Sequence, residues 1–320
     1  MNETTKAGLV LLNTQKGMNF GIDYYTYKVG DLFMGFKEIP KGIHFLSYST
    51  EDTVPNTSFF EYFEEDEVKV FEWNTKEEDF KTVSKEIELE MIYKFKNNKM
   101  YQHIAPYPLE IYKIWCGLSN QITKDILSKI EPVKKNIFPI SDNNSESKYH
   151  IYFTEIPKQL SLKNKTASEI SKMCFDKTEI LESILKKNSQ QEFLLGELQF
   201  SFILFLIGQN YNGFDQWKKI LDLFCNCDDA VEQYPKLFSK FISILEFQLE
   251  TTPDDFFIQD FTSENFLTKS LVSLFEIVLN EDEKNEELKK KTMKMKLKIE
   301  KKFKIKFDEL EEDLPVIVEI

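Results

Sequence analysis

The sequence of 320 residues contains no arginine, so all 41 of its basic residues are lysine. Arginine supplies the planar guanidinium that grips phosphates and guanine edges with two hydrogen bonds at once. Acidic residues number 54 and the net charge is -13, whereas non-specific nucleic-acid affinity depends on cationic side chains that release counterions. Direct nucleic-acid binding is therefore not expected.

Histidine and cysteine are also scarce, with three and four residues. Cys225 and Cys227 lie close together, but no second pair of Cys or His follows at the spacing of a zinc finger. Few, irregularly spaced cysteines do not make the disulfide framework of a secreted domain, so free thiols are expected. We predict no metal site and no cofactor.

Long apolar runs and nucleotide-binding glycine motifs are missing as well. The sequence has no GxGxxG, GxxxxGK[ST] or GxSxG motif. No window approaches the roughly 20 apolar residues of a membrane span, and the first twenty residues lack the features of a signal peptide. We therefore expect an intracellular protein, without membrane association and without a recognisable catalytic motif.

The N-terminal part of the chain has the pattern of a compact β unit. From Leu9 to about Phe95, apolar runs such as LVLL and IHFLSYS alternate with turn signals that contain Gly, Pro and Asp. Phe59–Phe63 and Val68–Trp73 are predicted to pair as a hairpin around Glu64–Asp66.

Helical spacing of apolar residues begins after Ile104 and returns from Ala167 onward. Residues 141–148, SDNNSESK, lack an apolar anchor and predict a linker, and residues 151–157, IYFTEIP, predict a short strand or an extended connector. We expect an α+β fold, with a β-rich, sandwich-like domain and packed helices at 1–140, a linker at 141–150, an α-helical domain at 151–307 and a tail at 308–320.

Two helices of the second domain have distinctive compositions. Residues 193–207 are apolar nearly all round, which predicts a helix buried on most sides. The last helix, at about 286–303, lies in a segment from Lys284 to Lys306 that holds eleven Lys and three Glu, a balance of 11 minus 3, or +8. We expect a solvated lysine face there, with attraction to an acidic protein or RNA surface as the alternative.

His44 is the candidate for acid–base chemistry. It lies in KGIHFLSYS, where strand alternation places it on the face opposite Ile43 and Phe45. A histidine oriented by a carboxylate, here Asp23, is a common acid–base unit. Buried histidines more often only hydrogen-bond a neighbouring strand, and we prefer this structural interpretation.

The chain ends in LPVIVEI, directly after the acidic stretch from Asp308 to Asp313. Proline suits the first position of a strand because it cannot donate to a ladder. Such a strand either adds to the open edge of a partner's sheet or folds back onto the N-terminal sheet, and the acids are typical gatekeepers against aggregation. The predicted partner-binding residues are Pro315, Val316, Ile317, Val318, Glu319 and Ile320.

Several segments of the chain resemble the Aar-two family of splicing factors, which help assemble the U-five small nuclear ribonucleoprotein. They are residues 20–49 (FGIDYYTYKVGDLFMGFKEIPKGIHFLSYS), 151–157 (IYFTEIP) and 196–225 (GELQFSFILFLIGQNYNGFDQWKKILDLFC). The terminal PVIVEI falls where that family also ends on an aliphatic strand. Little resemblance is found in Glu51–Lys99 and around the linker.

The resemblance implies a β-rich domain followed by a VHS-like helical domain, and no enzymatic activity. It also implies binding to the large spliceosomal scaffold protein of the U-five snRNP, through that partner's RNase H-like and Jab/MPN domains, with the tail adding a strand that bridges them and keeps the helicase out. We expect a monomeric assembly chaperone, cytoplasmic and nuclear. A hydrolase-like enzyme using His44 and Asp23 and a helical cargo-binding adaptor are the alternatives.

Overall fold

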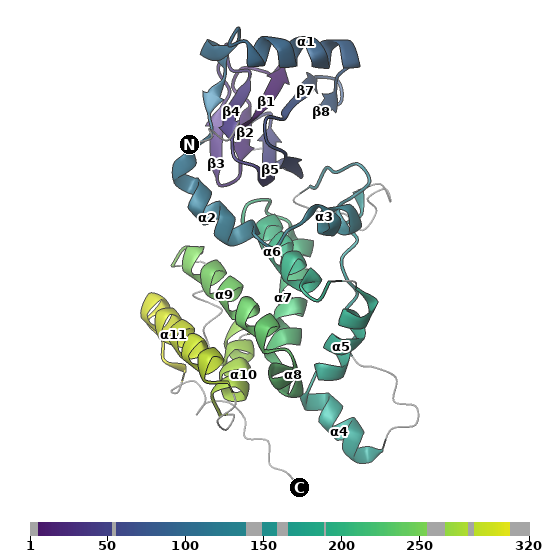
Figure 1. Cartoon of the computed structure of the whole chain (residues 1–320), viewed down its shortest axis with the longest axis vertical. Helices are drawn as coiled ribbons and strands as arrows, with labels where there is room; N and C mark the ends of the chain where they lie inside the picture. The colour runs from purple at the N-terminus through teal and green to yellow at the C-terminus, as the bar shows by residue number, and fades with distance from the viewer. Residues whose placement is uncertain are drawn as a thin grey trace. The chain divides into compact units, whose positions relative to one another are not determined.

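The computed structural model describes residues 6–52, 56–138, 149–158, 166–188, 190–254, 266–280 and 285–307. They belong to two compact units, one drawn from Met1–Tyr152 and Ile203–Asn212, the other from Phe153–Phe202 and Gly213–Ile320. A β-rich region is followed by a helical one, so the expected α+β fold is confirmed (Figure 1). Most of the predicted linker, 141–148, and the whole tail, 308–320, lie outside the described residues.

The described strands of the first unit form two sheets. The five-stranded sheet has the order β8-β7-β1-β4-β9 and the four-stranded sheet the order β3-β2-β5-β6. The strands are β1 (Ala7–Leu12), β2 (Asn19–Ile22), β3 (Tyr25–Lys28), β4 (Gly35–Ile39), β5 (Gly42–Ser49), β6 (Thr57–Phe63), β7 (Val68–Asn74), β8 (Asp79–Thr82) and β9 (Ala105–Pro106). Helices α1 (Lys85–Lys96), α2 (Leu109–Ser119) and α3 (Lys124–Ile130) complete the unit.

Strand β1 is apolar on both faces because both faces of its sheet are covered. Leu9 and Leu11 pack into the core between the two sheets, together with Phe20. Val10 points the other way and packs with Val70 beneath α1, which lies across this sheet in Figure 1. A strand buried on both sides has a continuous apolar sequence, which explains the run LVLL.

The predicted hairpin between residues 59–63 and 68–73 is wrong. Strand β6 pairs with β5 in the four-stranded sheet, whereas β7 pairs with β1 and β8 in the other sheet. Phe71 and Trp73 of β7 face the core between the sheets, and Val68 and Val70 face α1. Because β7 is apolar on both faces, a central position in the helix-covered sheet buries more of it than an edge hairpin would.

Helix α1 also departs from the sequence-based prediction, which continued the β pattern to about Phe95. Ser84 is the N-cap, and its hydroxyl accepts a hydrogen bond from the Ile87 N–H at 3.4 Å. Glutamates in the first turn and lysines in the last turn complement the helix dipole. Met91 and Phe95 then recur on the face that packs against the sheet, so the local signals for this helix were present.

The second unit is built from helices. They are α4 (Ala167–Phe175), α5 (Thr178–Lys187), α6 (Phe193–Leu206), α7 (Tyr211–Cys225), α8 (Asp228–Gln233), α9 (Pro235–Thr251), α10 (Phe266–Asn280) and α11 (Glu286–Phe303), with the end of α6 and the start of α7 assigned to the first unit. The predicted burial of α6 is confirmed, since every residue from Phe193 to Leu204 is buried. Within the described ranges, every helix falls short of a membrane span in length or in apolar character.

Gly35 on β4 is the position where the close approach of two strands requires glycine. Its φ is +126°, and an added Cβ would lie 2.0 Å from the carbonyl oxygen of Leu9 on β1. Gly35→Ala should therefore lower the free energy of unfolding by more than about 2 kcal/mol, because backbone has to move. Urea denaturation measures this loss. Gly30→Ala is the control, since nothing lies within 4 Å of the added Cβ, and an equal loss in both variants would contradict the explanation.

Candidate functional site

Asp23 lies in the tight turn between β2 and β3, in the left-handed backbone conformation with φ 54°. Short polar residues tolerate this conformation better than most. Its backbone N–H donates to the carbonyl of Phe45 on β5 at 2.7 Å. This turn brings the carboxylate against β5, where the residue is only 2% exposed.

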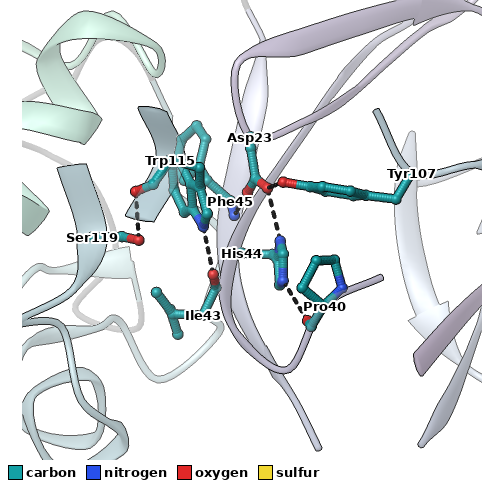
Figure 2. Close-up of polar contacts among 8 residues, drawn as sticks. All are labelled: Asp23, Pro40, Ile43, His44, Phe45, Tyr107, Trp115 and Ser119. Atoms are coloured by element: carbon teal, nitrogen blue, oxygen red, sulfur yellow. Dashed lines mark hydrogen bonds and ion pairs between the residues drawn. The ribbon is translucent and has the colours of Figure 1, made fainter. Parts of the chain in front are cut away.

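The Asp23 carboxylate is the centre of a buried polar network (Figure 2). One oxygen, Oδ1, accepts the Phe45 N–H at 2.9 Å. The other, Oδ2, accepts the Tyr107 hydroxyl at 2.6 Å and lies 2.7 Å from Nδ1 of His44. The predicted pairing of His44 with Asp23 is thus present in the structure, and Tyr107 is a third member that was not predicted from the sequence.

Both ring nitrogens of His44 are used inside the protein. Nε2 lies 2.8 Å from the carbonyl oxygen of Pro40, and because a carbonyl only accepts, Nε2 carries a hydrogen. Nδ1 lies 2.7 Å from Oδ2 of Asp23. The ring is fully buried between Phe63 and Tyr107, both edge-on, and Trp115, which is stacked at 6.3 Å.

The aromatic residues around the network are also fixed by hydrogen bonds. The Trp115 indole N–H donates to the carbonyl of Ile43 at 2.7 Å, and the Ser119 hydroxyl donates to the carbonyl of Trp115 at 2.8 Å. Burial, and then the neighbouring Asp23 carboxylate, raise the pKa of the Tyr107 hydroxyl far above its ordinary value. Tyr107 therefore stays protonated, and remains a donor, at neutral pH.

A pocket of about 350 Å³ opens beside this network, but the acid–base pair does not line it. Its walls include Ile43, Tyr112, Trp115 and Lys124, and neither Asp23 nor His44. An enzyme built on this pair needs a ring nitrogen within reach of a substrate, whereas both nitrogens of His44 are bonded internally. The geometry supports the structural interpretation of the pair.

A second buried carboxylate organises the helical unit. Glu197 on α6 is fully buried, and its oxygens accept the Thr154 N–H at 2.8 Å, the Thr154 hydroxyl at 2.6 Å and the Gln216 side-chain N–H at 2.8 Å. Gln216 on α7 also donates to the Thr154 carbonyl at 2.9 Å. Residues 151–158 form no helix or strand, so the extended-connector interpretation holds, and this network pins the connector to two helices.

The cysteines have the environment of packing thiols. Cys225 ends α7 and Cys227 precedes α8; both are free and buried. Burial raises the pKa of both thiols, and the Cys227 thiol donates to the Leu223 carbonyl at 3.0 Å. In the part of the chain that the structure describes, no group of three or more His, Cys, Asp or Glu side chains is placed to hold a metal ion.

The predicted partner-binding residues Pro315, Val316, Ile317, Val318, Glu319 and Ile320 lie outside the described residues. Both buried networks fall in the segments that carry the family resemblance, except for Tyr107. The signal for Glu197 was present in the sequence, since a carboxylate inside an otherwise apolar helix needs partners when it is buried. Which residues would supply those partners was not predictable from spacing, because Thr154 and Gln216 are distant in sequence.

Removing the Asp23 carboxylate should destabilise the protein strongly. Asp23→Ala leaves the Phe45 N–H and the Tyr107 hydroxyl buried without an acceptor, which should cost more than about 3 kcal/mol of unfolding free energy. Chemical denaturation followed by circular dichroism measures it. Asp31→Ala is the matched control, because Asp31 pairs with Lys16 on the surface at 2.7 Å and such pairs contribute little. Similar losses in the two variants would refute the role assigned to Asp23.

Glu197 should make stability fall as the pH rises. Burial raises its pKa in the folded state above the ordinary 4.5. Between pH 4.5 and the raised pKa, the folded state therefore binds more protons than the unfolded state. In that range the free energy of unfolding declines as the pH increases. Glu197→Gln should flatten this part of the profile, measured as unfolding free energy from pH 4 to 8. Glu192→Gln, whose carboxylate is half exposed beside Lys240, should leave the slope unchanged. A Glu197→Gln profile parallel to that of the unmodified protein would contradict the assignment.

Comparison with known proteins matches both units of the chain. The model of the AAR2 N-terminal domain matches residues 5–132, and that of the AAR2 C-terminal repeat region matches residues 153–308. The curated protein AAR2 homolog of Homo sapiens is 32% identical over 361 aligned residues, covering 98% of this chain and 94% of the relative. The homolog of Caenorhabditis elegans is 31% identical over 347 residues, covering 94% and 95%. Matches that extend over nearly the whole of both chains show that this protein belongs to the AAR2 family.

Proposed function

We propose that this chain, as a member of the AAR2 splicing-factor family, is a non-enzymatic assembly chaperone of the U-five snRNP. It binds the large spliceosomal scaffold protein through that partner's RNase H-like and Jab/MPN domains, as a monomer, in the cytoplasm and nucleus. Its tail adds a strand to the partner and prevents premature helicase binding. The observation that carries this proposal is the family match over both units, with relatives of nearly the same length.

The composition of the tail supports the strand-addition step. As a strand, residues 315–320 would place Val316, Val318 and Ile320 on one face and Ile317 and Glu319 on the other, and a strand of six residues spans about 20 Å. Strand addition gains affinity from main-chain hydrogen bonds and selectivity from alternate side-chain pockets. A tail that begins with proline and continues with β-branched residues meets both requirements.

The geometry of the His44 network supports a role without catalysis. A ring that is fully buried and bonded to Asp23 and Pro40 is held in place by the fold, and neither His44 nor Asp23 lines the neighbouring pocket. What the network does support is a rigid turn and strand that position the surrounding surface. A protein that acts by occupying a partner's surface needs such rigidity because ordering loops on binding costs free energy.

The tail can be tested within the full-length protein. Val318→Pro removes one main-chain donor from the predicted strand and should weaken binding to a scaffold fragment that contains the RNase H-like and Jab/MPN domains by about tenfold, or about 1.4 kcal/mol. Deletion of residues 314–320 should weaken it further, while the thermal unfolding midpoint stays within about 2 °C. Isothermal titration calorimetry and thermal denaturation provide the two readouts.

Glu319→Gln is the matched control, because it changes the tail without removing a backbone donor, and its affinity should stay close to that of the unmodified protein. Full affinity after deletion of residues 314–320 would refute the strand-addition step. A deletion that unfolds the protein would indicate that the strand belongs to its own sheet. Failure of the unmodified protein to bind the fragment would refute the proposed partner.

A further inference from the structure

The lysines of α11 fall into two groups with different surroundings. Lys298 pairs with Glu246 and, at 2.8 Å, with Glu250, both on α9. Lys302 donates to the carbonyls of Leu249 and Glu250 at 2.9 and 2.7 Å, where α9 ends and its dipole is negative. These two lysines attach α11 to α9. Part of the +8 charge of this segment is therefore paired within the fold, and these lysines do not belong to a solvated face.

The second group of lysines lines an open groove. The groove has a volume of about 660 Å³, and its walls include Lys290, Lys294 and Lys301 together with Met293 and Leu297. Lys298 of the first group also lines it. Met293 is 44% exposed and Leu297 59% exposed. No described residue accepts a hydrogen bond from the side chains of Lys290, Lys294 and Lys301, and none forms an ion pair with them. A stripe of exposed apolar side chains between cations suits a segment that is both acidic and apolar.

After α11 the described chain turns and packs against α10. Lys304 is the C-cap in the left-handed conformation, with φ 56°, and the Ile305 N–H donates to the Glu300 carbonyl, which reverses the chain direction. Phe307 is buried against Phe275 of α10, with the rings 4.9 Å apart. Its N–H donates to the Glu300 side chain at 3.1 Å.

Phe307 and α11 share the Phe275 ring as a neighbour. The Lys296 ammonium of α11 lies 5.6 Å from the centre of the same Phe275 ring, so Phe307 is level with the middle of α11. Leu279, one turn after Phe275 on α10, is part of the groove wall. From the level of Lys296 to that of Lys290 the helix advances about 9 Å.

We propose that the acidic segment Asp308–Asp313 of this same chain docks in the lysine groove of α11. The segment DELEED carries five carboxylates and one leucine, and Leu314 follows it. Extended, its six residues reach about 20 Å, more than the distance along the groove. Because the segment is tethered at Phe307, its effective concentration at the groove is in the millimolar range. The groove offers complementary charge to the carboxylates of the segment and apolar contact to its leucine.

The docking has a consequence for the tail, which rests on the proposed function. A segment held along α11 keeps residues 314–320 beside the helical unit until a partner sheet takes them up. The acids would then protect the β-branched strand from self-association by binding to the chain's own helix as well as by charge repulsion. A partner that binds the tail has to displace the segment, so high salt should favour release.

Zero-length carbodiimide cross-linking of the full-length protein tests the docking without any partner. The reagent joins a lysine amine to a carboxylate in direct contact, and mass spectrometry identifies the residues. We expect cross-links from Lys290 and Lys294 to residues 308–313, with a yield that drops at least about fivefold in 0.5 M NaCl because salt screens exposed charges. A mixture of isotope-labelled and unlabelled chains distinguishes links within one chain from links between chains.

Charge reversal provides a second readout that does not depend on the cross-linked amines. The triple variant Lys290→Glu, Lys294→Glu and Lys301→Glu should raise the rate at which a glutamate-specific protease cleaves within residues 309–312 by about fivefold or more. The control is a second triple variant with the same charge change, and it should leave the cleavage rate unchanged. It replaces three exposed helical lysines without described partners: Lys113→Glu, Lys187→Glu and Lys236→Glu.

Equal cleavage rates in the two triple variants would overturn the proposal, as would an absence of links to Lys290 and Lys294. Links that form only between labelled and unlabelled chains would assign the groove to a second copy instead. Neither readout involves the spliceosomal scaffold, so the docking can fail while the proposed function stands, and the reverse is also true.

Discussion

The β-rich unit depends on one carboxylate that is withdrawn from water. Asp23 can be buried only because its carboxylate is hydrogen-bonded with Phe45, Tyr107 and His44, and each of those groups would be costly to bury without Asp23. The network ties the β2–β3 turn to β5 and to the segment that precedes α2. Glu197 does the same for the helical unit, where it joins the connector to α6 and α7. Buried networks of this kind favour one arrangement of the chain over others because any misplacement leaves polar groups unpaired.

Local patterns were enough to predict the helices that bury one apolar face or are buried on all sides. The last helix was predicted at about 286–303 and runs from Glu286 to Phe303, with Leu288, Met295 and Ile299 buried. Period and composition determine such helices within the segment itself. The Asp23–His44 pair was also predictable in part, since both residues lie beside turn signals in a strongly apolar stretch. The β-rich and helical halves followed from the change in apolar spacing.

Pairing between distant segments was not predictable in the same way. Strands β6 and β7 are separated by a short turn, which favours a hairpin, yet β7 joins β1 of the other sheet because both of its faces are apolar. Tyr107 joins the Asp23 network from 84 residues away. The lysine-rich helix was interpreted as a solvated face, but Lys298 and Lys302 bind α9. Each of these outcomes depends on tertiary contacts that a single sequence does not encode locally.

Three features fit a protein that works by occupying a partner's surface. They are a rigid β unit, a helical unit with a cationic groove, and a tail that is acidic and rich in β-branched residues. The proposed function depends on residues 315–320 becoming a strand of the partner's sheet. Hydrogen–deuterium exchange of the amides of Val316–Ile320, with and without the scaffold fragment, tests it most directly, because strand addition engages main-chain donors. If strand addition occurs, alternate amides in this stretch should exchange at least about tenfold more slowly in the complex. A complex that forms with unchanged exchange at these amides would contradict it.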